Sequence, residues 1–426
     1  MKNKSYKPRV ADRTLERKLR GKGAVLIEGA KWCGKTTTAE QMARSVFYMS
    51  EMGKREQNIQ MARMNPAFIL KGDHPRLIDE WQEAPELWDA IRWEADHAGE
   101  FGLYILTGSA VPADMSNVSH TGTGRFAWLR MRPMSLWESG DSTGEVSLSQ
   151  LFDGAEMVEG RCAQDLERMA FLLCRGGWPQ AVNSDDDIAL DQSFDYVDAV
   201  AKRDIQAADG VTRDPEMVRR LLRSYARLQG SMSSIGTIRS DILANETNAL
   251  TEETIGLYIK ALKNIFVVED SLAWNPNLRS KTAIRSSDTR YFTDPSIATA
   301  ALGIGPKDLV NDLDTFGLLF ETLCVRDLRV FADALNGTVY HYRDKNGLEC
   351  DAVVHLRDGR YGLVEVKLGG DNLIASGAAT LTQLASKLDY TTMKRPSFMM
   401  VLTAVGPYAY KRDDGVFVVP IGCLRD

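Results

Sequence analysis

Short apolar runs alternate with amphipathic segments through the first third of the chain. Apolar strands are predicted at residues 25–27, 77–78 and 103–106, and helices at residues 35–45 and 86–98. Strands that alternate with helices are typical of a parallel sheet with crossover connections. The pattern therefore predicts an α/β fold whose first domain, residues 1–150, is built on a parallel sheet.

The middle of the chain has a mainly helical pattern. It breaks at the sequence Gly-Gly-Trp-Pro of residues 176–179, and an amphipathic helix follows at residues 215–228. Thr251 is placed to cap another helix, and residues 265–268 read as a strand after it. Helices followed by such a strand favour a winged-helix unit. We therefore expect a helical lid at residues 151–213 and a winged-helix-like unit at residues 214–300.

The last part of the chain predicts one helix followed by three strands. The helix is expected at residues 317–332, and the strands at residues 339–343, 349–356 and 361–368. The first two strands are joined through Asn346-Gly347, a strong hairpin signal. Residues 301–426 are thus expected to form a separate α/β domain.

Composition narrows the classes of protein that this chain can represent. It has 426 residues, 44% of them hydrophobic, and a formal net charge of -6, so any contact with nucleic acid needs a local basic patch. The six cysteines form no C-x-x-C pair, which is typical of reduced, buried thiols. The sequence shows neither a secretory leader nor an apolar run of membrane-spanning length, so we expect a cytoplasmic protein without a membrane partner.

The segment from Gly29 to Thr36 satisfies the spacing G-x-x-x-x-G-K-T in full. Its glycines let successive backbone N–H groups point at phosphate oxygens, and the following helix adds its positive end. We predict ATP as the ligand and Mg²⁺ as the cofactor. The residues expected to bind the nucleotide are Gly29, Gly34, Lys35, Thr36 and Thr37, with the Thr36 hydroxyl also a metal ligand.

Two neighbouring strands are expected to complete this site. Asp79 is predicted to hold Mg²⁺ and Glu80 to polarise the attacking water; the alternative is an exposed acidic pair at a helix start. Ser109 follows a buried strand and is a candidate γ-phosphate sensor, or part of a simple turn. Arg125 is a candidate for stabilising transition-state charge, in its own chain or in a neighbour's, or a solvated surface arginine.

The tail carries a second set of candidate residues. Glu365 and Lys367 share one face of a strand, and Asp351 lies on the preceding strand. Two carboxylates suit a hard cation that activates water beside a phosphodiester, and Glu321 is placed to add a further carboxylate ligand. An alternating strand with one solvated face gives the same letters. For His341, which has no partner pattern, we expect a structural or surface role rather than metal binding.

A candidate basic stripe lies in the middle region. Arg219, Arg223 and Arg227 share one helix face, although ion pairs on a solvated face explain the same spacing. Glu252 and Glu253 occupy the turn of the predicted recognition helix where base-contacting residues would sit, and acids there repel phosphate. This pattern favours protein packing over reading of the major groove.

Taken in order, these motifs resemble those of a known family. The match runs through the segment from Tyr6 to Leu19, the P-loop, the motifs at residues 77–80, 106–109, 124–125 and 132–136, and those at residues 176–179, 291–295, 320–321, 349–351 and 365–367. The chain resembles the bacterial and archaeal AAA-type ATPases that carry a C-terminal domain of unknown function with a PD-(D/E)xK nuclease-like fold.

The resemblance implies ATP binding, slow hydrolysis and a restriction-endonuclease-like C-terminal domain. The leading hypothesis is an ATP-regulated enzyme that processes DNA or another nucleic acid at Asp351, Glu365 and Lys367. The alternatives are an ATP-dependent switch or scaffold with an inactive C-terminal domain, and a motor that remodels nucleic acid without cutting it. A role of Arg125 in a neighbouring chain would require a homo-oligomer.

Overall fold

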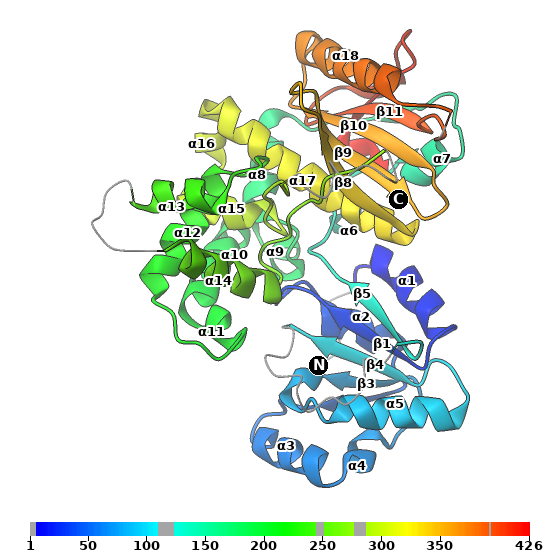
Figure 1. The fold of residues 1–426 in the computed structure, drawn as a ribbon, viewed down its shortest axis with the longest axis vertical. Coiled ribbons are helices and arrows are strands. Elements are labelled where there is room, and N and C mark those ends of the chain that lie inside the picture. The colour runs from blue at the N-terminus through cyan, green and yellow to red at the C-terminus, as the bar shows by residue number, and fades with distance from the viewer. Residues whose placement is uncertain (1–5, 110–122, 244–250, 277–286, 392) are drawn as a thin grey trace. The chain divides into compact units, whose positions relative to one another are not determined.

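The structure is a computed structural model that describes residues 6–109, 123–243, 251–276, 287–391 and 393–426. The chain divides into two compact units that interleave in sequence (Figure 1). Unit 1 comprises Met1–Pro133, Lys202–Arg213 and Lys260–Phe266. Unit 2 comprises Met134–Ala201, Asp214–Ile259 and Val267–Asp426.

Unit 1 is built on a five-stranded parallel sheet in the order β2-β3-β4-β1-β5. Its strands are β1 (Ala24–Glu28), β2 (Ser45–Tyr48), β3 (Arg76–Asp79), β4 (Tyr104–Gly108) and β5 (Phe126–Arg130). Because all five run the same way, the ends of β1, β3 and β4 meet at one edge, where Glu28 pairs with Gly108 and Asp79 with Thr107. Ligands of open parallel sheets bind at this carboxyl edge.

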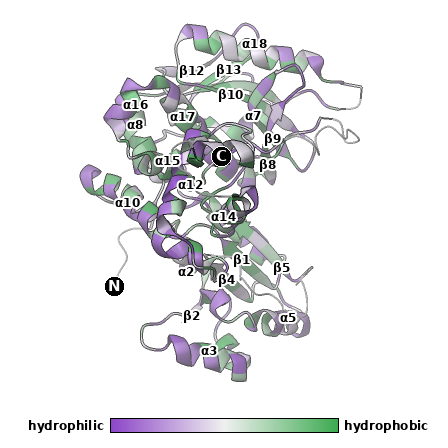
Figure 2. Cartoon of the chain, turned by 60° about the vertical axis from the view of Figure 1, so that its left-hand side comes forward, coloured by the Kyte–Doolittle hydropathy of each residue, from purple (hydrophilic) through white to green (hydrophobic). Residues whose placement is uncertain are grey.

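Helices pack on the sheet of unit 1 and form a buried core with it. The helices are α1 (Val10–Leu19), α2 (Lys35–Met42), α3 (Arg55–Met64), α4 (Pro66–Leu70), α5 (Leu87–Ala98) and α11 (Ile205–Ala207), with the 3-10 turn η1 (Trp81–Glu83). Strands β1 and β4 are hydrophobic along much of their length (Figure 2). Trp88 of α5 stacks on Phe126 with ring centroids 3.9 Å apart, which fixes this helix on the sheet. The parallel sheet predicted from the sequence is confirmed.

The helices of unit 2 come mainly from the middle of the chain. They are α6 (Leu136–Ser139), α7 (Leu148–Phe152), α8 (Leu166–Arg175), α9 (Pro179–Val182), α10 (Asp186–Ala199), α12 (Pro215–Arg227), α13 (Ile235–Leu243), α15 (Pro295–Leu302), α16 (Pro306–Asn311), α17 (Leu313–Ala334) and α18 (Asp371–Lys387). A π-helical turn, η2 (Val200–Asp204), follows α10, and both η2 and α14 (Glu252–Asn264) are divided between the units. The predicted amphipathic helix is α12, whose Val218, Leu221, Leu222 and Tyr225 are buried.

Unit 2 also contains a mixed seven-stranded sheet in the order β7-β12-β13-β11-β10-β9-β8. Its strands are β7 (Gly160–Arg161), β8 (Gly337–Arg343), β9 (Glu349–Leu356), β10 (Tyr361–Lys367), β11 (Phe398–Thr403), β12 (Tyr408–Lys411) and β13 (Phe417–Pro420). Two short strands, β6 (Val146–Ser147) and β14 (Leu424–Arg425), pair separately, and the 3-10 turn η4 (Ile421–Cys423) precedes β14.

Two helices pack on this sheet. Helix α17 contacts β8, β9 and β10, and α18 packs on β10 and β11 (Figure 1). Strands β8, β9 and β10 are antiparallel neighbours, whereas β11 runs parallel to β10 after the crossover through α18. The helix and the three strands predicted for the tail are confirmed.

A buried network of charged and backbone groups explains several of the sequence motifs in unit 2. The Arg326 guanidinium donates to Asp294, with 2.8 Å between Nη1 and Oδ2, and to Asp327, with 2.8 Å between Nε and Oδ1. Asp294 also accepts the Gly177 N–H and Asp327 the Leu136 N–H. A side chain at Gly177 would lie 2.1 Å from the Met134 carbonyl oxygen, so only glycine fits. The sequence motifs at residues 132–136, 176–179 and 291–295 therefore serve the structure of unit 2.

One predicted element is absent. Residues 265–268 form a turn after α14, with Phe266 in the left-handed region, and only Val268 makes an isolated bridge, to Phe292. The strand prediction at this place is therefore wrong. The winged-helix-like unit remains a prediction; residues 244–250 and 277–286 of it lie outside the described part of the chain.

The structure also bears on the cysteines and on membrane-spanning segments. All six cysteines are free and buried, as predicted. Within the described residues, every helix is too short or too polar to cross a membrane.

Candidate functional site

The loop after β1 has the backbone geometry that phosphate binding requires. A Cβ atom at Gly29 would lie 2.0 Å from the Met131 carbonyl oxygen, so the loop can pass β5 only with glycine here. Gly34 has a φ of +100° and is the N-cap of α2, which begins at Lys35. Left-handed backbone at the cap turns amide groups toward the loop interior, and the helix N-terminus favours an anion there.

The side chain of Lys35, the first residue of α2, turns back into this loop. The side chain is buried, and Nζ donates to the carbonyl oxygens of Gly29 at 2.9 Å and Ala30 at 2.8 Å. The ammonium group is therefore held at the centre of the loop by neutral acceptors. Phosphate oxygens carry more charge than these carbonyls and would be stronger partners for it.

Three strand and helix ends meet at Asp79. The hydroxyl groups of Thr36 and Thr107 both donate to Asp79 Oδ1, at 2.7 Å and 2.6 Å. A hydroxyl and a carboxylate in contact beside a phosphate loop form the oxygen donor set that Mg²⁺ takes together with nucleotide phosphates and water. The residues present thus fit a magnesium ion, which Thr36 and Asp79 would hold and which would offset the charge of the phosphates.

Glu80 and Ser109 lie beside this group. Glu80 has a left-handed backbone with φ of +57°, and its carboxylate accepts from Ser109 Oγ at 3.4 Å and from the Gln82 amide. Such a conformation costs energy for a residue with a side chain and is often found at functional sites. The structure thus brings Asp79, Glu80 and Ser109 to one edge of the sheet, although β4 lies between β3 and the P-loop strand β1, which were expected to be neighbours.

The remaining two candidates of the nucleotide site are Thr37, which directly follows Thr36 in the first turn of α2, and Arg125. Thr37 is on the exposed side of α2. Arg125 precedes β5, and its carbonyl accepts the N–H of Ala24, the first residue of β1, so it lies at the edge of the sheet opposite to the P-loop. There it pairs with Asp96. Arg125 thus cannot contact a nucleotide bound to its own P-loop, and only a role in a neighbouring chain remains as a prediction.

Arg9 is a residue of this site that the sequence analysis did not assign. It is buried, and its guanidinium donates to the carbonyl oxygens of Cys33 and Arg132, both at 2.8 Å. It thereby ties the P-loop to the segment after β5. Its position in the Tyr6–Leu19 segment of the family pattern was the only signal for it.

The predicted residues of the tail converge in unit 2. Lys367 Nζ lies 2.7 Å from Glu365 Oε2 and 3.5 Å from Asp351 Oδ2. Strands β9 and β10 pair as far as Ala352 and Val364, and the next free N–H, of Val366, donates to Asp351 at 2.7 Å. A side chain at Gly377 of α18 would be 3.4 Å from Glu365 Cβ. The helix therefore covers this cluster closely, and Glu365 is only 4% exposed.

Glu321 of α17 completes the cluster. Burial and the negative charge of Asp351 raise the pKa of Glu321 well above its ordinary value, and the same causes raise the pKa of Glu365 to about 8. Burial alone would lower the pKa of Lys367, but Asp351 and Glu365 raise it above its ordinary value. Three carboxylates thus share one buried region with a single ammonium group, and an additional cation would relieve their repulsion.

These donors fit a hard divalent cation in chemistry, although they do not enclose one. Among the described residues, no group of three or more histidine, cysteine, aspartate or glutamate side chains is arranged to hold a metal ion. Mg²⁺ commonly takes one or two carboxylates and keeps several waters. Glu321 and Asp351, which line one pocket, would be the two carboxylate ligands of such an ion, with water at its other positions.

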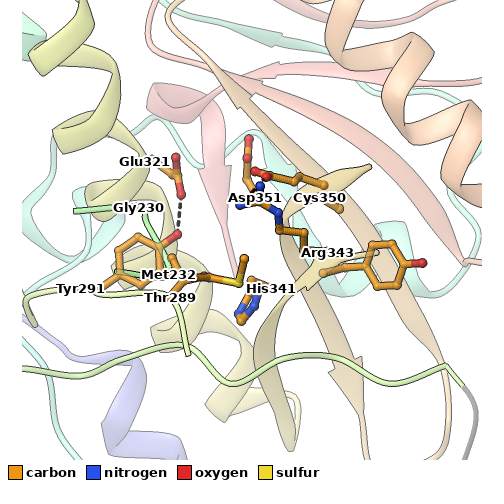
Figure 3. Close-up of a pocket in the computed structure, with 11 residues that line it drawn as sticks. Gly230, Met232, Thr289, Tyr291, Glu321, His341, Arg343, Cys350 and Asp351 are labelled. Atoms are coloured by element: carbon orange, nitrogen blue, oxygen red, sulfur yellow. Dashed lines mark hydrogen bonds and ion pairs between the residues drawn. The ribbon is translucent and has the colours of Figure 1, made fainter. Parts of the chain in front are cut away.

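A small pocket opens beside Glu321 and Asp351 (Figure 3). His341 of β8 is among its lining residues, buried, with Nδ1 3.0 Å from the Ser271 carbonyl oxygen. Because a carbonyl only accepts, Nδ1 carries a proton in this tautomer. The expected structural role of His341 agrees with this contact, and its place in the pocket was not predicted.

The candidate basic stripe on α12 is largely neutralised. Arg219 pairs with Asp198 and Glu216, and Arg227 pairs with Asp241. These ion pairs of two of the three arginines match the reading of a solvated helix face.

Three parts of the chain match known protein families. Residues 21–139 match an AAA domain, residues 166–308 a domain of unknown function (DUF8612), and residues 316–424 another domain of unknown function (DUF4143). Together with the geometry around Lys35 and Asp79, the first match supports a P-loop ATPase in the first third of the chain.

Individual relatives are distant. An uncharacterized protein of Mycobacterium tuberculosis is 23% identical over 357 residues, which are 83% of this chain and 72% of the relative. A dITP/XTP pyrophosphatase of Staphylococcus aureus is 33% identical over 106 residues, 24% of this chain and 50% of that protein. A Walker-type ATPase of Pyrococcus abyssi has a solved structure that aligns with 68% of this chain and 94% of its own, with a TM-score of 0.42 and 16% identity.

Proposed function

We propose that this chain binds ATP with Mg²⁺ at its P-loop and hydrolyses it. The observation that carries this proposal is the contact of Thr36 and Thr107 with Asp79 at the mouth of a phosphate loop. Glu80, next to them, is the candidate general base, and Lys35 the candidate ligand of the β- and γ-phosphates.

We further propose that unit 2 carries a metal-dependent phosphodiesterase site for nucleic acid. The convergence of Glu321, Asp351, Glu365 and Lys367 supports it. The order of elements supports it as well, because the helix α17, the antiparallel strands β8 to β10, the helix α18 and the parallel strand β11 follow the arrangement expected of a PD-(D/E)xK nuclease-like domain. In this proposal the nucleotide state of the P-loop controls cleavage.

A second candidate function is an ATP-dependent switch or scaffold with an inactive C-terminal domain. The observation in its favour is that Lys367 is ion-paired with both Glu365 and Asp351, while no complete metal ligand set exists among the described side chains. In this alternative the ion pairs serve stability, and the domain binds a partner without cutting nucleic acid.

Cleavage assays decide between the two candidates. Plasmid, linear and single-stranded DNA and RNA would be incubated with Mg²⁺ or Mn²⁺, with and without ATP. Glu365→Ala and Lys367→Ala should abolish cleavage, whereas Lys387→Ala, which breaks the more exposed ion pair with Asp344, should leave it intact. An uncut set of substrates with the wild-type protein, together with normal ATPase activity, would favour the switch.

The ATP site has its own test. Lys35→Ala should remove ATP binding, measured with a fluorescent ATP analogue, while circular dichroism stays unchanged. Lys54→Ala, which loses only a surface ion pair with Glu51, is the matched control. Unchanged nucleotide affinity in Lys35→Ala would disprove the assignment of the P-loop.

A further inference from the structure

The carboxylate of Glu321 is closely surrounded by neighbouring groups. The hydroxyl group of Tyr291 donates a hydrogen bond to Glu321 Oε1, and both residues lie at the pocket (Figure 3). On the other side, a Cβ atom at Gly230 would be 3.2 Å and 3.3 Å from the two carboxylate oxygens of Glu321. The carboxylate is therefore confined between a phenol and a backbone segment that comes within van der Waals range.

These two neighbours come from segments that precede α17 and are fastened to each other. Gly230 N donates to the Arg290 carbonyl at 3.0 Å, and Arg290 N donates to the Ser231 carbonyl at 2.9 Å. Two backbone hydrogen bonds thus join the two segments at Arg290, the residue before Tyr291. Their backbone hydrogen bonds hold the phenol and Gly230 in a fixed relation.

The same segments are attached to α17 directly beside Glu321. The buried Gln229 side chain accepts the Phe292 N–H at 3.1 Å and the Thr322 hydroxyl at 3.0 Å, both on Oε1. Thr322 follows Glu321 in the helix. One amide oxygen therefore joins both segments to the helix, so that Glu321 has little freedom to turn away from Asp351.

We propose that Tyr291 is a positioning residue for the phosphodiesterase site, and that it orients Glu321 as a ligand for a divalent cation shared with Asp351. This inference rests on the proposed function of unit 2. It implies that the catalytic site is not contained in residues 316–424 alone, because the groups that orient Glu321 lie in the preceding region.

The physical reason is the mutual repulsion of the carboxylates. Glu321 and Asp351 line the same pocket, and two carboxylates that face one space repel each other when both are ionised. A hydrogen bond from a buried phenol keeps the carboxylate in place before a cation arrives. Groups that orient metal ligands in this way typically change metal affinity or activity by about 10- to 100-fold when they are removed.

Tyr291→Phe removes only the hydroxyl group, and a matched control is available. Tyr225 is also a fully buried tyrosine of unit 2, and its hydroxyl donates to a carboxylate, that of Asp270, which does not line the pocket although it also accepts the Tyr291 N–H. Tyr225→Phe therefore makes the same chemical change in the same unit. Thermal unfolding of both variants shows whether they lose similar stability.

The first measurement is Mn²⁺ binding by calorimetry, in full-length protein that also carries Asp79→Asn to silence the P-loop. We expect Tyr291→Phe to weaken binding about 10-fold or more, Glu321→Gln to weaken it at least as much, and Tyr225→Phe to leave it unchanged. The inference would be overturned if Tyr291→Phe bound Mn²⁺ as tightly as the wild-type protein while Glu321→Gln bound it more weakly.

The second measurement is the Mg²⁺ dependence of cleavage. Tyr291→Phe should require about 10-fold more Mg²⁺ for half-maximal cleavage and should approach wild-type kcat at saturating Mg²⁺, which loss of structure alone would not produce. A lowered kcat at every Mg²⁺ concentration would overturn the inference and leave the phosphodiesterase in place. Absence of both cleavage and Mn²⁺ binding in wild type would instead refute the proposed function, and the inference with it.

Discussion

The hydroxyl group of Thr36 donates to the carboxylate of Asp79, with 2.7 Å between Oγ1 and Oδ1. This contact joins the first turn of α2, the helix after the P-loop, to the end of β3. In the sheet, β3 is separated by β4 from β1, the strand that leads into the P-loop. It brings together two oxygen groups that suit Mg²⁺, although they lie far apart in sequence.

Asp79→Asn should weaken the contribution of Mg²⁺ to ATP binding, because an amide oxygen is a poorer ligand for a hard cation than a carboxylate. ATP affinity would be measured in Mg²⁺ and in EDTA. We expect the wild-type protein to bind ATP about 10-fold or more tightly in Mg²⁺ than in EDTA, and Asp79→Asn to lose most of this difference. Asp73→Asn, on the exposed loop before β3, is the control, and an unchanged ratio in Asp79→Asn would contradict the magnesium assignment.

Glu80→Gln should separate hydrolysis from binding. The carboxylate is held beside Ser109 at the carboxyl edge of the sheet, where a general base would act on water. Loss of a general base typically costs about 10²- to 10⁴-fold in rate, so phosphate release should fall by at least about 100-fold while ATP affinity stays within about twofold. Glu83→Gln, which loses a salt bridge to Arg55, serves as the control. Hydrolysis at the wild-type rate in Glu80→Gln would exclude Glu80 as the base.

The nucleotide site could be predicted from the sequence because its parts are contiguous. Gly29 to Thr36 form one segment, and Asp79 ends an apolar strand that Glu80 follows directly. The order of the strands was not needed for this prediction, because all parallel strands of one sheet bring their carboxyl ends to the same edge. The tail was predictable for a similar reason, because alternation along a strand fixes which side chains share a face.

Contacts between distant segments were not predictable in this way. Arg125 was a candidate for the nucleotide site, yet only the register of β5 on β1 shows that it lies at the opposite edge of the sheet. The hydrogen bond from Tyr291 to Glu321 depends on the path of a whole segment past α17. The wrong strand at residues 265–268 had the apolar composition of a strand, but its residues are buried as a turn.

Arg9→Met should disturb the P-loop from outside. The guanidinium donates to the backbone carbonyls of Cys33 and Arg132, and hydrogen bonds from charged groups contribute about 1.5–3 kcal/mol each. Losing them frees the loop, and we expect ATP affinity to fall about 10-fold with the unfolding midpoint lowered. Arg20→Met, at the exposed end of α1, is the control for loss of one charge. Normal ATP affinity in Arg9→Met would show that the loop holds its shape without this arginine.

Arg326→Met tests the buried network of unit 2. The substitution keeps much of the apolar volume but leaves Asp294 and Asp327 buried without their cation, and the two carboxylates are 0% and 1% exposed. Breaking a buried ion pair from one side typically costs about 3–5 kcal/mol, because the remaining charge has lost its partner. We therefore expect the free energy of unfolding of unit 2, measured in urea, to fall by about 3–5 kcal/mol.

A control and a reversal make this prediction specific. Arg360→Met removes exposed ion pairs to Asp153 and Asp358, which should cost at most about 1 kcal/mol. Replacing Asp294 and Asp327 by asparagine in the Arg326→Met background removes the unpaired charges and should recover part of the lost stability. If Arg326→Met were no less stable than Arg360→Met, the network would not be what holds residues 134, 177 and 294 together.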